Sequence, residues 1–195
     1  MTKTDNIAVT QAVHDLGAAL WFGGSVAGVA GFNKAGNDLA DPLDRIRVAN
    51  SAWRRFGPVE WAGLAANAIA GLQLTRANKG RVALQQGYGR AGAVKAGLTA
   101  VGALATAYAA YTGGRIGKLE QQARQQGRSF DVKDASQPSE QTPPEVAKWQ
   151  KRQRVAQYLV PTISGGNVVL GSYLTRAYRP GATARGVVRR LLPAV

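Results

Sequence analysis

Four long stretches of this 195-residue chain contain no charged residue and no histidine. They cover residues 16–33, 61–75, 96–114 and 155–175. A helix needs about 20 mostly apolar residues to cross about 30 Å of hydrocarbon. The last two stretches reach that length directly, and the first two reach it when they are extended to His14 or to Glu60. A soluble helical bundle is the alternative, but its outer face would carry charges every few residues. The pattern therefore favours a membrane protein.

The pattern predicts an all-α fold, with residues 1–195 forming a single integral membrane domain built as a four-transmembrane-helix bundle. The expected spans cover residues 7–33, 56–76, 91–114 and 155–176. Asp41, Pro42 and Asp44 follow one another as an N-cap, a first-turn proline and a first-turn acid. They predict a short helix over residues 42–55, which lies at the membrane interface or leads straight into the second span.

Two polar regions lie outside the expected spans. Residues 115–142 are rich in glutamine, serine and charged residues and have almost no large apolar side chains. We therefore expect a partly helical, partly disordered loop in this region. Residues 177–195 are basic and are expected to form a tail at the membrane surface.

The formal net charge of the chain is +14. In a soluble protein this excess would suggest nucleic acid as a partner. Here the basic residues flank the expected spans, where they bind anionic lipid headgroups, and no nucleic-acid motif accompanies them. The abundance of alanine, glycine and arginine is typical of a GC-rich bacterial genome. We expect a multi-pass protein of a bacterial inner membrane that contacts other membrane subunits or further copies of itself, with no nucleic-acid partner.

The first expected span carries small and aromatic residues along one helical face. At steps of three and four residues, this face presents His14 followed by Gly17, Trp21, Gly24, Gly28 and Gly31. Glycines destabilise a helix in water, but in a bilayer small residues allow two helices to approach closely. The five residues after His14 are therefore predicted to be helix-packing residues.

Three ionisable residues, His14, Glu60 and Lys95, fall near the ends of the expected spans. The first and third spans start from the same side of the membrane, so His14 and Lys95 are expected at similar depth, whereas Glu60 belongs to the opposite side. Asp15 lies about 100° away from His14 around the helix, which favours a solvated cap over a partner of the imidazole. Such groups are candidate functional residues. The alternatives are a structural hydrogen bond for His14 and an ammonium that reaches the headgroups for Lys95.

The composition excludes several kinds of reactive site. The chain has no cysteine, one histidine and one methionine. It can therefore form no disulfide, no zinc site with the usual Cys and His ligands, and no cysteine–histidine nucleophile pair. We expect no metal site and no catalytic residue.

The first expected span has the form His-x-x-Gly-x-x-x-Trp-x-Gly-Gly, from His14 to Gly24. Further along the chain come Arg55-Phe56, Gly71 and Lys95. This arrangement, over residues 8–115, resembles the copper-resistance D-like superfamily of bacterial four-helix membrane proteins. That superfamily is similar to membrane-embedded haem-binding proteins, including a bacterial protoporphyrinogen oxidase, in which a first-helix histidine and a third-helix lysine are the functional pair. The resemblance implies that His14 and Lys95 occupy the matching positions.

We expect a non-enzymatic protein without a cofactor. It would be an accessory or scaffold subunit of a membrane complex, or a small channel-like or transport-associated component. The alternative is a haem- or metal-binding redox protein that binds haem b through His14 and Lys95, which are the strong donors expected at one depth.

Overall fold

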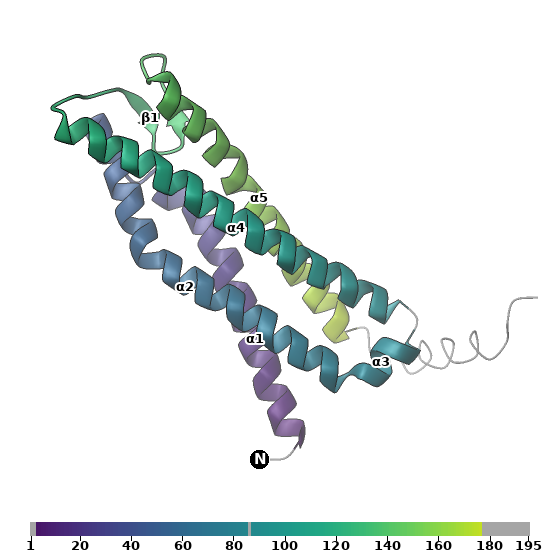
Figure 1. Ribbon diagram of the computed structural model, residues 1–195. Helices are drawn as coiled ribbons and strands as arrows, with labels where there is room; N and C mark the ends of the chain where they lie inside the picture. The colour runs from purple at the N-terminus through teal and green to yellow at the C-terminus, as the bar shows by residue number, and fades with distance from the viewer. Residues whose placement is uncertain (1–2, 86, 177–195) are drawn as a thin grey trace, which may run out of the picture.

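The computed structural model describes residues 3–85 and 87–176, and this part of the chain is mostly helical. The expected tail over residues 177–195 lies outside the described residues. The long helices are α1 (Lys3–Ala27), α2 (Pro42–Ala77), α4 (Tyr88–Gln125) and α5 (Pro144–Arg176). The shorter elements are the π-helical turn η1 (Gly28–Phe32), the helix α3 (Lys79–Leu84) and the strands β1 (Val132–Asp134) and β2 (Gln137–Pro138). Figure 1 shows the four long helices side by side, with the strands at one end of the bundle.

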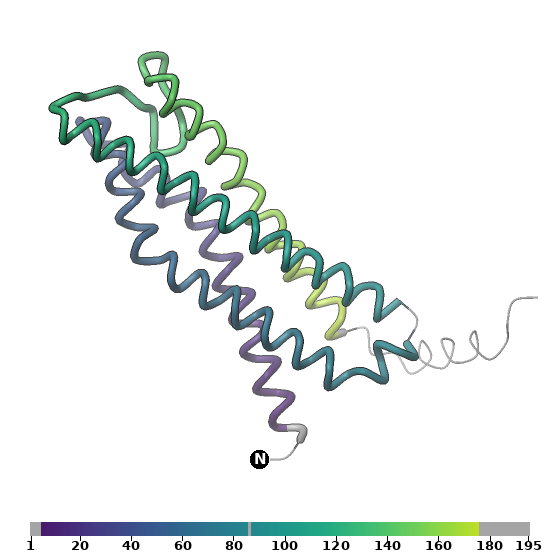
Figure 2. The backbone as a smooth tube through the Cα atoms, viewed as in Figure 1, coloured from purple at the N-terminus to yellow at the C-terminus, as the bar shows by residue number. Residues whose placement is uncertain are grey.

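Consecutive long helices run in opposite directions, as the tube in Figure 2 shows. α1 packs mainly against α2, and α4 packs mainly against α5. α2 also contacts α4, and α5 contacts α1. The helices therefore form an up-and-down four-helix bundle that closes on itself.

Residues 42–55 do not form a separate interfacial helix. They are the first part of α2, which continues through Pro58 to Ala77. Asp41 caps this helix as predicted, because its side chain accepts a hydrogen bond from the Leu43 amide at 2.8 Å. The two halves are continuous because they present one buried face, which carries Leu43, Ile46, Ala49, Gly63, Leu64 and Asn67.

Residues 115–142 are more ordered than their composition predicted. The expectation of partial helix agrees with α4, which continues to Gln125, but the expected disorder does not agree with the paired strands β1 and β2. Ile116 and Val132 are buried in one cluster with Ile46 and Val146. The few apolar residues of this region are enough to form a packed core, because α2 and α5 supply the other apolar side chains of the cluster.

Ion pairs hold the same end of the bundle together. Arg124, near the end of α4, pairs with Glu120 on its own helix and with Asp44 on α2. It also lies 3.4 Å from a carboxylate oxygen of Asp41. Arg45 of α2 donates a hydrogen bond to the Val132 carbonyl oxygen at 2.8 Å. The start of α2 is thus fixed to the end of α4 and to β1.

Two helical segments among the described residues are long and apolar enough to cross a membrane. They are Asp5–Phe32 and Tyr88–Gln125. α2 and α5 are also long, with 36 and 33 residues, but their first halves contain several arginines or lysines, and their second halves include asparagine, glutamine or serine. These polar residues lower the mean hydropathy of both helices.

Alongside an apolar core that includes Trp21, Leu64 and Val160, many positions of the bundle have a polarity that is reversed relative to that of a soluble protein. Many buried side chains are polar, among them His14, Ser25, Glu60, Asn67, Thr106, Gln153, Ser164 and Asn167. Many large apolar side chains are 54–72% exposed, among them Leu16, Ile69, Val101, Leu104, Val155 and Val169. Single exposed apolar residues are ordinary on a soluble protein, but here they occur on all four long helices.

Candidate functional site

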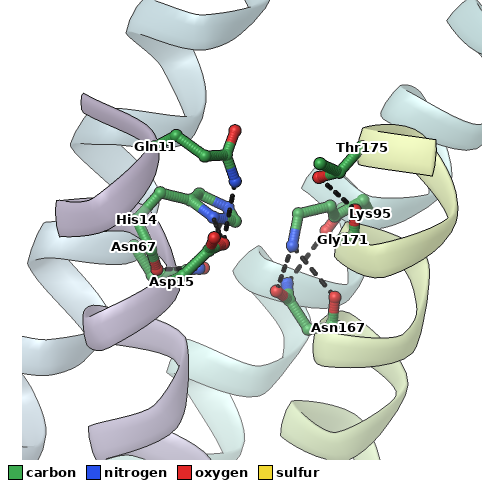
Figure 3. A network of polar contacts seen from close by, with 8 residues as sticks. All are labelled: Gln11, His14, Asp15, Asn67, Lys95, Asn167, Gly171 and Thr175. Atoms are coloured by element: carbon green, nitrogen blue, oxygen red, sulfur yellow. Dashed lines mark hydrogen bonds and ion pairs between the residues drawn. The ribbon is translucent and has the colours of Figure 1, made fainter. Parts of the chain in front are cut away.

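A cluster of polar side chains from all four long helices lies in the half of the bundle away from the strands, as two hydrogen-bonded groups, one on α1 and α2 and one on α4 and α5. It contains His14 and Asp15 from α1, Asn67 from α2, Lys95 from α4 and Asn167 from α5 (Figure 3). His14, Asn67 and Asn167 are buried, Lys95 is partly buried, and the exposed Asp15 follows His14 directly in the chain. The cluster includes both residues that the sequence analysis singled out as a candidate pair.

His14 connects α1 to α2. Its side chain is buried, and Asn67 Nδ2 lies 3.1 Å from Nε2. Asn67 Nδ2 also donates to the His14 carbonyl oxygen at 3.3 Å. A neutral imidazole that accepts from Asn67 at Nε2 and carries its proton on Nδ1 satisfies these contacts. His14 therefore has the structural hydrogen bond that was one of the two expectations for it.

Asp15 is a partner of His14, so the prediction that it would not be one was wrong, although its side chain is 60% exposed, as expected for a solvated group. Its Oδ1 lies 2.9 Å from His14 Nδ1. The angular argument failed because Nδ1 lies close to the main chain, where the short carboxylate of the next residue can turn back to reach it. Gln11 donates a hydrogen bond to the same oxygen at 2.9 Å and helps to hold it there.

Lys95 connects α4 to α5. Its Nζ donates to the carbonyl oxygen of Asn167 at 2.9 Å and to Oδ1 of the same residue at 2.5 Å. Asn167, which is fully buried, donates in turn to Thr99 Oγ1 at 2.6 Å. The ammonium is therefore directed into the bundle rather than toward the headgroup region. These two bonds use two of its three N–H donors.

His14 and Lys95 face one groove beside α5. A Cβ atom added to Gly171 would lie 3.2 Å from Lys95 Nζ and 3.8 Å from His14 Cε1. The absence of a side chain at Gly171 thus leaves space between the two residues. The groove has a volume of about 380 Å³, and its walls include Asp15, Ala18, Phe22 and Ser172.

The geometry does not fit axial ligation of a haem iron by His14 and Lys95. Both ring nitrogens of His14 have protein partners, and Nε2 could coordinate iron only if Asn67 gave up its bond. The Lys95 ammonium is held by Asn167, and it would have to lose its proton to coordinate a metal.

Most of the predicted helix-packing residues do pack between helices. Trp21 is fully buried, and its Nε1 donates to Thr106 Oγ1 on α4 at 3.1 Å. A Cβ on Gly17 would lie 2.6 Å from the Asn67 amide nitrogen. Gly24 faces the ring of Phe56, and Gly28 faces the ring of Trp53.

Gly31 is the exception and was wrongly predicted as a packing residue. It is exposed, and no atom lies within 4 Å of the position of an added Cβ. The cause is the π-helical turn η1, in which the Asn33 amide donates to the Gly28 carbonyl oxygen at 3.1 Å. A π turn holds more residues than an α turn, so it rotates Gly31 away from the contact face.

The sequence analysis did not single out Asn67 or Asn167. Both are asparagines within long apolar segments, where an amide side chain is costly unless it has partners. This property is the signal that could have identified them.

Comparison with protein-family models, with curated proteins and with solved structures finds no match for this chain. The resemblance to the copper-resistance D-like superfamily therefore stays a prediction.

Proposed function

We propose that this protein is an integral membrane protein and that all four long helices span the bilayer. The reversed polarity of the bundle is the observation that supports this proposal. In hydrocarbon, large apolar side chains face the lipid without cost, and buried polar side chains bond to one another across helix contacts. The second halves of α2 and α5 fit this arrangement, because Asn67, Ser164 and Asn167 are buried while Ile69, Leu72 and Val169 are exposed.

The membrane proposal predicts how the protein behaves when native membranes are washed. High salt and alkaline carbonate remove proteins that are held by headgroup charge, because salt screens that attraction. We expect this protein to stay in the membrane pellet after both washes and to enter solution only with detergent. Immunoblotting of pellet and supernatant provides the measurement. Release by either wash would contradict the proposal.

The proposed function is that of an accessory subunit in a larger membrane complex. α4 supports this role, because only 11% of its most apolar stretch is buried within the chain, compared with 33% for α1. The outward face of α4 also includes Ala93, Gly97 and Ala100, which are exposed. In a bilayer, small residues are enriched where helices from different subunits meet. α4 is therefore the proposed contact with a partner subunit.

Replacing Gly97 with leucine tests this contact. An added Cβ at Gly97 has no atom within 4 Å, so the bundle itself should accept the larger side chain. Mild detergent extracts of native membranes are expected to contain the wild-type protein in a complex heavier than one chain, and G97L is expected to migrate as a single chain on a native gel. Gly23 of α1 is also exposed and has open space, so G23L is the matched control and should keep the complex. Wild-type protein that migrates as a single chain would overturn the accessory role.

A haem-binding redox protein is the second candidate, because His14 and Lys95 border one groove at Gly171. The hydrogen bonds of both residues oppose it. Absorption spectra of the purified protein, with and without added haem, distinguish the two candidates. We expect no Soret band beyond that of free haem, and no difference between wild-type protein and H14A. A Soret band that H14A abolishes would replace the accessory proposal with the haem protein.

A further inference from the structure

A second cavity lies in the half of the bundle nearer the strands. It has a volume of about 230 Å³ and is bordered by residues of η1 and all four long helices. Most of its wall is apolar, with Ala109, Gly113 and Val160 among the residues that form it. The indole rings of Trp53 and Trp61 also border the cavity. It shares no residue with the groove beside His14 and Lys95.

Glu60 borders this cavity and is only 5% exposed. Within residues 3–85 and 87–176, its carboxyl group makes no hydrogen bond or ion pair. Three other polar residues of the wall do have partners. Ser25 donates to the Phe22 carbonyl oxygen at 2.8 Å, Thr106 accepts from Trp21 at 3.1 Å, and Gln157 accepts from Asn33 at 2.6 Å. Glu60 thus brings an uncompensated acid to an apolar space, which is costly for a charged group.

We propose that this cavity binds a small hydrophobic organic cation, with the Glu60 carboxylate as its counter-ion. The charge of the ligand would remove the cost of the unpaired carboxylate, and its carbon substituents would contact the alanine, glycine and valine wall. An indole face of Trp53 or Trp61, which both border the cavity, would add cation–π attraction to a cation within about 6 Å of the ring. A hydrated metal ion fits less well, because hard cations require several oxygen ligands and this wall is mostly carbon.

Arg54 also borders the cavity and is the competing cation within the chain. It is exposed and does not pair with Glu60. If its side chain were the true occupant, R54Q would bind an added cation more tightly than wild-type protein does.

The test uses the purified full-length protein in a nonionic detergent and benzyltrimethylammonium as the probe. Isothermal titration calorimetry should show saturable binding of one probe per chain. E60Q, which keeps the shape of the side chain, should weaken binding by about tenfold or more. D15N is the control, because Asp15 lines only the other groove, and it should leave the affinity unchanged. Absence of saturable binding to wild-type protein, or equal affinity in E60Q, would overturn the proposal.

A second measurement needs no variant. Neopentylbenzene has the shape of the probe without its charge, because carbon replaces nitrogen. It should not compete for the site at concentrations at which benzyltrimethylammonium saturates it, and equal competition would show an apolar cavity without a role for the carboxylate. An R54Q variant that binds tightly while wild-type protein does not would assign the site to Arg54. The calorimetric titration and the competition experiment do not depend on the accessory role, because the cavity lies within a single chain.

Discussion

Leucine at position 17 is expected to destabilise the bundle by about 3 kcal/mol or more, since overpacking against atoms that cannot move is among the costlier substitutions. A Cβ on Gly17 would lie 2.6 Å from two main-chain atoms of α2, the Asn67 nitrogen and the Gly63 oxygen. Main-chain atoms inside a helix cannot yield as a side chain does, so α1 and α2 would have to separate. Thermal unfolding in detergent, followed by circular dichroism, measures the loss.

The matched control for Gly17 lies on the same helix. Gly23 has open space around an added Cβ, so G23L should unfold within a few degrees of wild-type protein. The unfolding temperatures of G24A and G28A should fall between those of G17L and G23L. The added Cβ atoms would meet the rings of Phe56 and Trp53, and these side chains can shift. Equal unfolding temperatures for G17L and G23L would show that α1 and α2 do not cross in this way.

Asn167 is the position with the second-largest expected effect. In N167L the side chain can no longer accept from the Lys95 ammonium or donate to Thr99. Hydrogen bonds to charged groups contribute about 1.5–3 kcal/mol, so a loss of stability of this size is expected. The free energy of unfolding in detergent provides the measurement.

The double variant K95M/N167L separates the lost bond from the unpaired charge. If the cost of N167L comes mainly from an ammonium that has lost its side-chain acceptor and keeps only the main-chain carbonyl of residue 167, then removing that ammonium should restore part of the stability. The double variant is expected to be more stable than N167L alone. Additive losses in the two single variants would show that Lys95 and Asn167 are not coupled.

Periodicity predicted those features of the fold that depend on regular helix geometry. A stripe at steps of three and four residues was enough to place Trp21 and Gly24 at helix contacts, because both lie within the regular part of α1. The same reasoning failed at Gly31, where a π turn changes the angle per residue. It also failed at Asp15, because a helical angle gives the direction of the Cα–Cβ bond and not the position that the carboxylate reaches.

Features that depend on distant parts of the chain were harder to predict. The region after Gln125 seemed too polar to fold when judged by its own residues, yet Val132 is fully buried because α2 and α5 provide its neighbours. Similarly, the candidate pair His14 and Lys95 was found by comparing depths, but their actual partners were not. Asn67 and Asn167 lie far from them in sequence, and only the packing of the helices brings them within hydrogen-bond distance.

If α2 spans a bilayer as proposed, its continuity through Pro58 determines how far the protein extends beyond the lipid. A helix of 36 residues is about 54 Å long at 1.5 Å per residue, whereas the hydrocarbon layer is about 30 Å thick. For a chain that spans the membrane, roughly 20 Å of bundle therefore projects into water. The ion pairs of Arg124 with Asp41 and Asp44 and the cluster around Ile46 and Val132 belong to this projecting part. One chain would then fold in two solvents, with ion pairs between its helices where water surrounds it and hydrogen bonds between buried polar side chains where lipid does.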